Sequence, residues 1–227
     1  MFGSVFAFEL RYRLRDPVFW ASALVLFAMT FSVTVAEGVQ FGSGGHIKAN
    51  SPYAILLAQM MLAVFFMFVT TSFVANAVVR DDESGFGPII HATRVTKFDY
   101  LIGRFAGAMI AARFACALVP LGIAVGSLMP WLDPETLGPH RASYYLNSYL
   151  FYVAPTIIVT GSIFFAVATA TRSMVYSYAS VIGFLVLYAG FDIIMVGEPD
   201  LAEFAAIIDP LGISSVAYET RYWTATE

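Results

Sequence analysis

Residues Pro17 to Ala36 have the sequence PVFWASALVLFAMTFSVTVA, an uncharged run of 20 residues between Asp16 and Glu37. A helix needs about 20 apolar residues to cross the hydrocarbon core of a bilayer, so this run predicts a transmembrane helix. Four further runs are apolar without the alternation of a β-barrel strand; two of them are uncharged, and the other two are each interrupted by one charge, Arg113 and Asp192. The sequence therefore predicts an all-α bundle of about five transmembrane spans, at residues 17–36, 53–79, 105–129, 149–171 and 173–196.

Composition supports the same class of protein. Of the 227 residues, 59% are hydrophobic and 12% are charged, which is about half the charged share of a soluble domain. Together with a mean hydropathy of +0.75, these values exclude a soluble globular domain and a disordered chain. Cys116 is the single cysteine, which excludes a disulfide scaffold. The net charge of −4 offers no electrostatic footprint for a nucleic-acid partner.

Lysine and arginine residues predict the orientation, because cytoplasmic loops are enriched in both. With the N-terminus in the cytoplasm, eight of them fall inside: Arg11, Arg13, Arg15, Arg80, Arg94, Lys97, Arg104 and Arg172. Three fall outside: Lys48, Arg141 and Arg221. Five spans then leave the C-terminus outside, so residues 198–227 form an extracytoplasmic tail.

The two ends of the chain predict helices at the membrane surface. Residues 1–16 repeat Phe2, Phe6, Leu10 and Leu14 every four positions, which favours an amphipathic helix on the cytoplasmic surface. Glu9 and Arg13 lie close to that stripe, and a plain basic topology anchor is the alternative. In the tail, apolar residues three to four apart predict a short helix that ends at the Asp209–Gly212 turn: Leu201, Phe204, Ala205 and Ile208.

The third span carries small residues at a spacing of four. They are Gly103, Gly107, Ala111 and Ala115, followed by Gly122 and Gly126. Small residues on one face let helices approach closely in lipid. We predict that they pack helices within one bundle, with a dimer seam as the alternative. Pro120, between the two sets, predicts a kink.

Two ionisable residues, Arg113 and Asp192, fall inside predicted spans. A charge in the hydrocarbon layer is costly and usually faces protein or water. Snorkelling to the interface is the simple interpretation of Arg113. The functional alternative is a contact with a lipid headgroup or with an acidic side chain of the bundle. Asp192 is open to the same two interpretations.

The segment between the second and third spans, residues 80–104, has the sequence RDDESGFGPIIHATRVTKFDYLIGR. Pro88 suits the first position of a helix. Thr96 with Asp99 resembles a capping box, which predicts that the next long helix begins near Lys97. The pattern favours a short helix presented to the cytoplasm, and an ordinary charged connector is the alternative.

This segment resembles the cytoplasmic loop of type-2 ABC exporter permeases, whose pattern is similar to E-R-E-x-G-T-x-x-x-L-L-x-T-P-x-S-R-x-x-x-L-x-G-K. The matching residues are Asp81, Glu83, Gly85, Ile89, Ile90, Thr93, Thr96, Leu101, Gly103 and Arg104. Arg94 stands where the family often has proline. The resemblance implies that a coupling helix contacts an ATPase through Asp81, Asp82, Glu83, Gly85, Pro88, Ile89, Ile90, Thr93 and Arg94.

The resemblance also implies a setting for the chain. It would lie in the bacterial inner membrane, bound to a separate cytoplasmic ABC ATPase that holds ATP and magnesium, and paired with a second permease half or a second copy. No Walker motif, H-E-x-x-H motif or other catalytic constellation occurs in the sequence. We therefore expect neither an enzyme nor a resident cofactor or metal site in this chain.

A closer resemblance links the 80–104 segment and the tail at residues 209–224 to permeases fused to a zinc aminopeptidase. It leaves an alternative function, in which the chain is the membrane anchor of a larger fused peptidase with no transport of its own. The family implies six spans, and five are predicted here. This difference suggests an N-terminal fragment, or a half that has lost its sixth helix.

Overall fold

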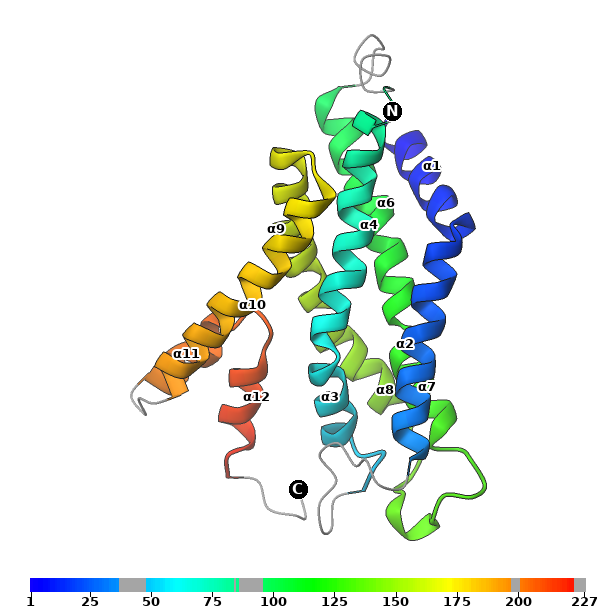
Figure 1. Cartoon of the computed structure of the whole chain (residues 1–227). Coiled ribbons are helices and arrows are strands. Elements are labelled where there is room, and N and C mark those ends of the chain that lie inside the picture. Colours follow the sequence, from blue (N-terminus) through cyan, green and yellow to red (C-terminus); the bar gives the residue numbers. More distant parts are fainter. Residues whose placement is uncertain (37–47, 84, 86–95, 197–200, 223–227) are drawn as a thin grey trace. The chain divides into compact units, whose positions relative to one another are not determined.

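In the computed structural model, the described residues are 1–36, 48–83, 85, 96–196 and 201–222 (Figure 1). These residues form helices, turns and connections, without a β-strand among them. Five helices are long and apolar enough to cross a membrane: Pro17–Val35, Ala63–Asp81, Lys97–Gly126, Ala142–Thr171 and Met174–Met195. The predicted all-α polytopic bundle is therefore confirmed, and the chain is a membrane protein. Helices suit this role because each satisfies its own backbone hydrogen bonds in lipid.

The helices have bounds that refine the predicted spans. In chain order they are α1 (Phe2–Arg15), α2 (Pro17–Val35), α3 (Pro52–Met61), α4 (Ala63–Glu83), α6 (Lys97–Cys116), α7 (Leu118–Gly126), the 3-10 turn η1 (Pro134–Thr136), α8 (Ala142–Ser148), the π-helical turn η2 (Tyr149–Val153), α9 (Ala154–Thr171), α10 (Met174–Val196), α11 (Ala202–Ile208) and α12 (Ile213–Thr220).

The second predicted span, residues 53–79, is divided in the structure. Its first part is α3, where Ser51 caps the N-terminus by accepting the Ala54 N–H at 3.2 Å. The helix is interrupted at Leu62, whose ψ of −2° departs from helical geometry. The second part, α4, continues through the charged residues to Glu83. The connection to α6 is therefore residues 84–96, shorter than the predicted 80–104.

The third span begins at Lys97 instead of residue 105. The Thr96 hydroxyl accepts the Asp99 N–H at 3.1 Å, which confirms the helix start predicted from these two residues. The helix is interrupted at Ala117, between α6 and α7. Pro120 explains this position, because it has no N–H to donate and its ring crowds the carbonyl of Cys116 four residues earlier.

The fourth span begins at Ala142, seven residues before the predicted start. Its backbone widens into the π-helical turn η2 just before Pro155. Pro155 has no N–H for the carbonyl of Phe151, and a locally widened turn accommodates that loss. Between α9 and α10, Arg172 adopts a φ of 51°, a left-handed conformation that reverses the chain within two residues.

The tail contains the predicted helix α11 and a second helix, α12, that was not predicted. Asp209 joins them, because its carboxylate accepts the N–H groups of Leu211 at 2.8 Å and Ser214 at 2.5 Å. Gly212 lies between them with a φ of 69°, which favours glycine. The predicted apolar pattern ended at Ile208. A second pattern with helical spacing, Ile213, Val216 and Ala217, was present in the sequence and corresponds to α12.

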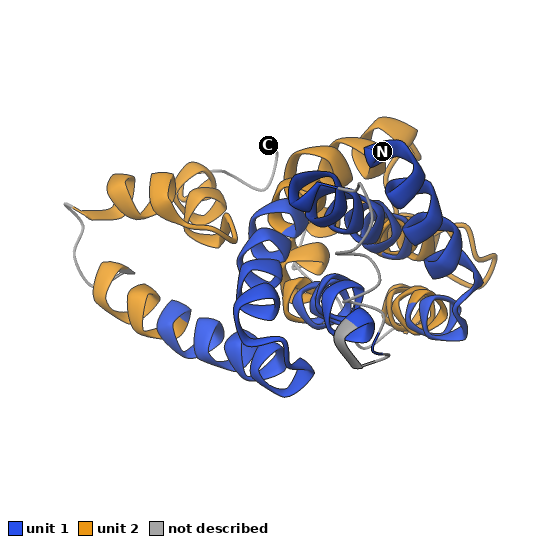
Figure 2. Cartoon of the chain, turned by 90° about the horizontal axis from the view of Figure 1, so that it is seen from above, with its two compact units in different colours: residues 1–22, 65–115, 157–188 blue, residues 23–64, 116–156, 189–227 orange. Residues whose placement is uncertain are grey.

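Two compact units can be described separately (Figure 2). Unit 1 comprises residues 1–22, 65–115 and 157–188, and its core includes the buried side chains of Phe66, Phe73, Val74, Ile157 and Phe164. Unit 2 comprises residues 23–64, 116–156 and 189–227. In unit 2, α3 packs against α7 and α8, and α11 packs against α12.

Helix α1 turns a different face to the protein from the one its apolar stripe predicts. Phe2 and Leu14 of that stripe are exposed, whereas Glu9 and Arg13 are buried. Buried charges are tolerated only when they are paired and hydrogen-bonded. The reason for the reversed face is therefore found in the partners of these two residues within unit 1.

Candidate functional site

Glu9 is the centre of a buried ion-pair network in unit 1. Its side chain is fully buried, and its carboxylate accepts hydrogen bonds from Arg13 Nε at 2.9 Å and Arg80 Nη2 at 3.0 Å. Arg104 Nη1 donates a third. These arginines come from α1, from the end of α4 and from the start of α6. One carboxylate thus joins three helices.

Asp81 is the second buried carboxylate of this network. It accepts a hydrogen bond from the Tyr100 hydroxyl at 2.5 Å and one from Arg104 Nη2, and it lies 3.7 Å from Arg80 Nε. Arg104 therefore bridges both carboxylates. We call the network the Glu9 cluster, and its members are Glu9, Arg13, Arg80, Asp81, Tyr100 and Arg104.

The charges of the Glu9 cluster are balanced at its edge. Three guanidinium groups face two carboxylates, and Asp16 supplies a third at 3.8 Å from Arg13 Nη1. Burial lowers the pKa of the Arg13 guanidinium, and the adjacent Glu9 carboxylate opposes that shift. Arg13 also donates from Nη2 to the backbone carbonyl of Phe73 at 2.9 Å, so that charge is fully engaged.

Aromatic rings cover the cations of the cluster. The Arg80 guanidinium carbon lies 3.9 Å from the centre of the Tyr12 ring, and that of Arg104 lies 5.2 Å from the Phe8 ring. These distances are within the range of cation–π attraction, which is stronger where water is excluded. Tyr12 and Phe8 are neighbours on α1 with ring centres 6.4 Å apart. They reinforce the docking of α1 on α4 and α6.

Two glycines of α6 explain how α1 comes close enough for these contacts. A Cβ atom at Gly103 would lie 2.9 Å from the Cβ of Val5, and one at Gly107 would lie 2.8 Å from the Cβ of Glu9. Contacts this short do not occur in packed proteins, so α1 would have to move away from any larger residue. Within unit 1, these two glycines lie against α1.

The remaining small residues lie further along the same span. Ala111 and Ala115 are fully buried in unit 1. In unit 2, Gly122 and Gly126 of α7 lie against α2: their Cβ atoms would be 2.8 Å from the Phe27 carbonyl and 2.9 Å from the Thr34 Cβ. Gly122 and Gly126 are thus at close helix contacts inside one chain, and Ala111 and Ala115 are buried.

The Glu9 cluster also contains two donors without a partner. Arg80 Nη1 and Arg104 Nε are buried, and the described part of the chain provides no acceptor for either. An unsatisfied buried donor costs roughly 1–3 kcal/mol. Both belong to the arginines beside the ends of the 84–96 connection. Among the described residues, two buried nitrogens of the network thus have no acceptor at that side.

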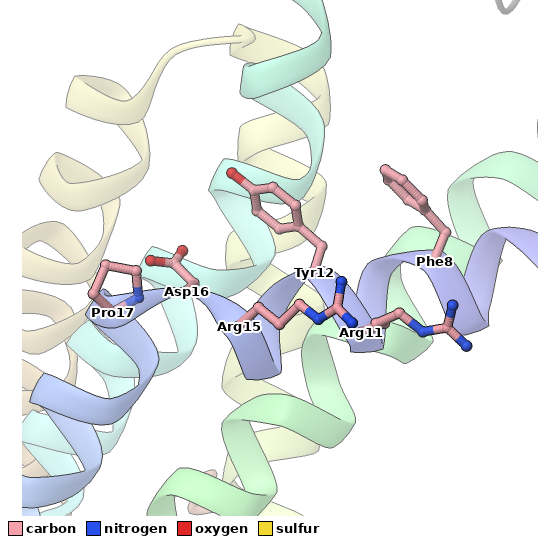
Figure 3. Close-up of a pocket in the computed structure, with 6 residues that line it drawn as sticks. All are labelled: Phe8, Arg11, Tyr12, Arg15, Asp16 and Pro17. Carbon is pink, nitrogen blue, oxygen red and sulfur yellow. The ribbon is translucent and has the colours of Figure 1, made fainter.

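The opposite face of α1 is solvent-accessible and basic (Figure 3). Arg11 and Arg15 are exposed there, and with Phe8 and Tyr12 they line an open pocket of about 360 Å³ that reaches Asp16 and Pro17. Trp20 lies nearby, 61% exposed, and its indole N–H donates to the Leu14 carbonyl at 3.0 Å. An exposed tryptophan beside a basic helix is typical of a membrane interface.

The residues predicted for ATPase coupling are only partly described. Asp81 belongs to the Glu9 cluster. Asp82 and Glu83 form the end of α4, and their side chains lie outside the described part. Gly85 is exposed with a φ of 68°, a turn conformation that favours glycine. The other predicted residues also lie outside the described part: Pro88, Ile89, Ile90, Thr93 and Arg94.

The two predicted intramembrane charges belong to different units. Arg113 is on α6 in unit 1, and Asp192 is on α10 in unit 2. Both are half-buried. Neither is part of the Glu9 cluster.

Four members of the Glu9 cluster, Glu9, Arg13, Arg80 and Tyr100, were missed as site residues, and Arg104 appeared only within the family pattern. One signal was present, because Glu9 and Arg13 are four residues apart and interrupt an otherwise apolar stripe. Such a pair on the buried side of an amphipathic helix indicates ionic partners elsewhere. Which arginines provide them depends on tertiary packing.

Chemically, the site is a set of ion pairs around two carboxylates. Among the described residues, no group of three histidine, cysteine, aspartate or glutamate side chains gathers as metal ligands. Comparisons with protein-family models, with curated proteins and with solved structures give no match. A function for the chain must therefore be argued from the Glu9 cluster and the sequence pattern.

Proposed function

We propose that this chain is the transmembrane permease subunit of an ATP-driven ABC exporter. Its 84–96 connection would bind a separate cytoplasmic ATPase subunit. The sequence pattern of residues 80–104 suggests the class. The observation that carries the proposal is the Glu9 cluster, because it ties both ends of that connection to each other and to α1.

The contacts define how a movement of the connection would reach the membrane. Asp81 at the end of α4 is bonded to Tyr100 and Arg104 at the start of α6. Glu9 is bonded to arginines on those same two helices. A displacement imposed on the connection would therefore move the ends of α4, α6 and α1 together. Rigid-body motion of this kind is a recurrent means of switching a protein between states.

The proposal also assigns the setting of the chain. The N-terminus and the 84–96 connection face the cytoplasm of a bacterial cell, and the tail lies outside the inner membrane. ATP and magnesium bind to the ATPase partner. A second permease half, or a second copy of this chain, completes the translocation pathway.

The first experiment tests docking. The full chain is co-expressed with the ABC-type ATPase encoded beside its gene, and the amount of ATPase that co-purifies is measured. We expect Glu83→Ala and Gly85→Val to lose most of it, since both change the predicted contact segment. Glu203→Ala on α11 and Gly183→Ala on α10 are matched controls that should retain it.

Two results would count against the proposal. Equal retention of ATPase by all four variants would remove the coupling role of the connection. If the unaltered chain retains no ATPase, and the coding sequence continues past Glu227 into a domain with an H-E-x-x-H motif, the peptidase-anchor function is favoured instead.

The second experiment tests transmission. Arg104→Gln removes the residue that bridges Glu9 and Asp81 but leaves the connection itself unaltered. We expect this variant to bind the ATPase normally and to change its ATP hydrolysis rate less than the unaltered chain does. An unchanged effect on hydrolysis would mean that the cluster is structural only.

A further inference from the structure

A second site lies in unit 2, where a groove of about 480 Å³ runs between α7 and α8. Its lining is mainly apolar and includes Pro120, Leu121, Ala124, Leu128, Tyr145 and Leu146. This volume is within the range of small-molecule sites, about 300–1,000 Å³. Two polar residues complete the lining, His140 and Arg141, and both come from the connection that precedes α8.

The groove lies where two candidate spans end. By length and composition, the candidate span that contains α7 ends at Gly126 and the one that contains α8 begins at Ala142, so Arg141 directly precedes a candidate span. Trp131 in the connection is 57% exposed, as expected for the aromatic belt of an interface. The apolar lining thus belongs to the ends of two candidate spans, and Arg141 lies just outside one of them.

The rim of the groove is held in place by Asn50, which is almost fully buried. Its side-chain amide donates to the Gly138 carbonyl at 2.9 Å and accepts the Gly138 N–H at 2.6 Å. Its Nδ2 also lies 3.4 Å from Nδ1 of His140. Beside it, the Ala49 N–H donates to the Thr136 carbonyl at 3.0 Å. We call these contacts the Asn50 clamp, and they position the residues just before Arg141.

Charge decides what can occupy this groove selectively. An acyl chain gains no hydrophobic free energy by leaving other lipid for an apolar groove, because both are equally apolar. Selectivity must therefore come from the headgroup. Arg141 is the one charged side chain among the described residues that line the groove. A guanidinium pairs with phosphate through two parallel hydrogen bonds, and a net negative headgroup adds long-range attraction.

We propose that this groove binds one anionic phospholipid. Its acyl chain lies along Pro120, Leu121 and Leu128 of α7, and its phosphate binds Arg141. This inference does not depend on the proposed ABC permease function, since it concerns unit 2 alone.

The test measures lipid retained by the purified full chain. The chain is reconstituted with equal amounts of phosphatidylglycerol and phosphatidylcholine, and native mass spectrometry counts the lipid of each kind that remains bound. We expect phosphatidylglycerol to be retained preferentially. Arg141→Gln should weaken its binding roughly tenfold, because a hydrogen bond to a charged group is lost. Ala124→Phe should reduce it similarly by filling the groove.

Arg221→Gln is the matched control. Arg141 and Arg221 are both exposed arginines of unit 2 beside a tyrosine ring: the guanidinium carbon of Arg141 lies 5.9 Å from the Tyr144 ring centre, and that of Arg221 lies 4.0 Å from the Tyr218 ring centre. Arg221→Gln should leave retention unchanged. Equal loss in Arg221→Gln and Arg141→Gln would indicate unspecific attraction and overturn the proposal, as would equal retention of the two lipids.

A second measurement covers the case in which Ala124→Phe fails to fold. Phosphatidylglycerol with a photoreactive group in its acyl chain is added to the unaltered protein and crosslinked. We expect labelled peptides from residues 117–128 and 142–149. Labelling confined to other segments would overturn the proposal. Competition by glycerol phosphate as strong as that by the intact lipid would indicate a free-phosphate site instead.

Discussion

Two connections of this chain are held by different kinds of interaction. The ends of residues 84–96 in unit 1 are joined by buried ion pairs between side chains. Residues 127–141 in unit 2 are joined to residues 48–51 mainly by neutral amide and backbone hydrogen bonds, with one further hydrogen bond from the exposed Lys48 ammonium to the Glu135 carbonyl. Burying charges requires that every one be compensated, and the arrangement is then highly sensitive to the loss of a single partner. Neutral hydrogen bonds also fix the geometry, but the loss of any one of them lowers the free energy of unfolding by less.

This difference suggests different roles for the two connections. A network of ion pairs can exchange partners, since each guanidinium offers five N–H donors. Two buried nitrogens of the Glu9 cluster, Arg80 Nη1 and Arg104 Nε, have no acceptor among the described residues. Such a network suits a place where helices must move together. The Asn50 clamp has donor and acceptor on the same pair of residues, which suits a rim that must stay in place.

The comparison is tested most strongly by Glu9→Gln. The substitution keeps the shape of the side chain but leaves three guanidinium groups, of which those of Arg13 and Arg104 are buried, with one buried carboxylate. We expect a loss of about 3–5 kcal/mol in the free energy of unfolding, as for other broken buried ion pairs. Unfolding in mixed detergent micelles measures this.

Glu203→Gln is the control for that experiment, because Glu203 is exposed on α11. Its effect should be within about 0.5 kcal/mol. If Glu9→Gln lowers the free energy of unfolding by less than about 1 kcal/mol, the buried ion pairs are not the main interaction that holds α1, α4 and α6 together. The proposed difference between the two connections would then be wrong.

A second variant tests the close packing of α1 on α6 without removing any charge from the Glu9 cluster. Gly107→Ala adds a Cβ atom 2.8 Å from that of Glu9, so α1 must shift away from α6. We expect a loss of about 1–3 kcal/mol, typical of overpacking. Gly183→Ala is its matched control, since nothing lies within 4 Å of that position, and alanine there should be neutral or stabilising by up to about 1 kcal/mol.

The same measurement applied to unit 2 uses Asn50→Ala. The substitution removes two hydrogen bonds to Gly138, and we expect a loss of about 1–2 kcal/mol. Asn147→Ala, at an exposed position of α8, should have little effect. If Asn50→Ala lowered the free energy of unfolding as much as Glu9→Gln does, the Glu9 cluster would not be the more strongly stabilising of the two sets of contacts.

The sequence was informative where the physics is local. The long apolar runs predicted five spans, and Thr96 with Asp99 predicted the start of α6, because helix length and capping depend on neighbouring residues. The interruption at Leu62 carried no such signal, since neither proline nor glycine is there. Two partners of Glu9 could not be predicted from the sequence either, because Arg80 and Arg104 are 71 and 95 residues away in the chain. Only tertiary packing selects them.

The smallest change in the free energy of unfolding is expected for substitutions on the exposed face of α1. These substitutions allow exposed and buried arginines of one helix to be compared directly. Arg11 and Arg15 carry the same charge as Arg13, but they are exposed, while Arg13 is 2% exposed and bonded to Glu9. We expect Arg11→Gln with Arg15→Gln to change the free energy of unfolding by less than about 0.5 kcal/mol. Arg13→Gln should cost several times more, because it leaves Glu9 with two partners instead of three. Equal effects of the exposed pair and of Arg13 would mean that α1 is held by its overall charge, and that the buried geometry around Glu9 does not determine its position.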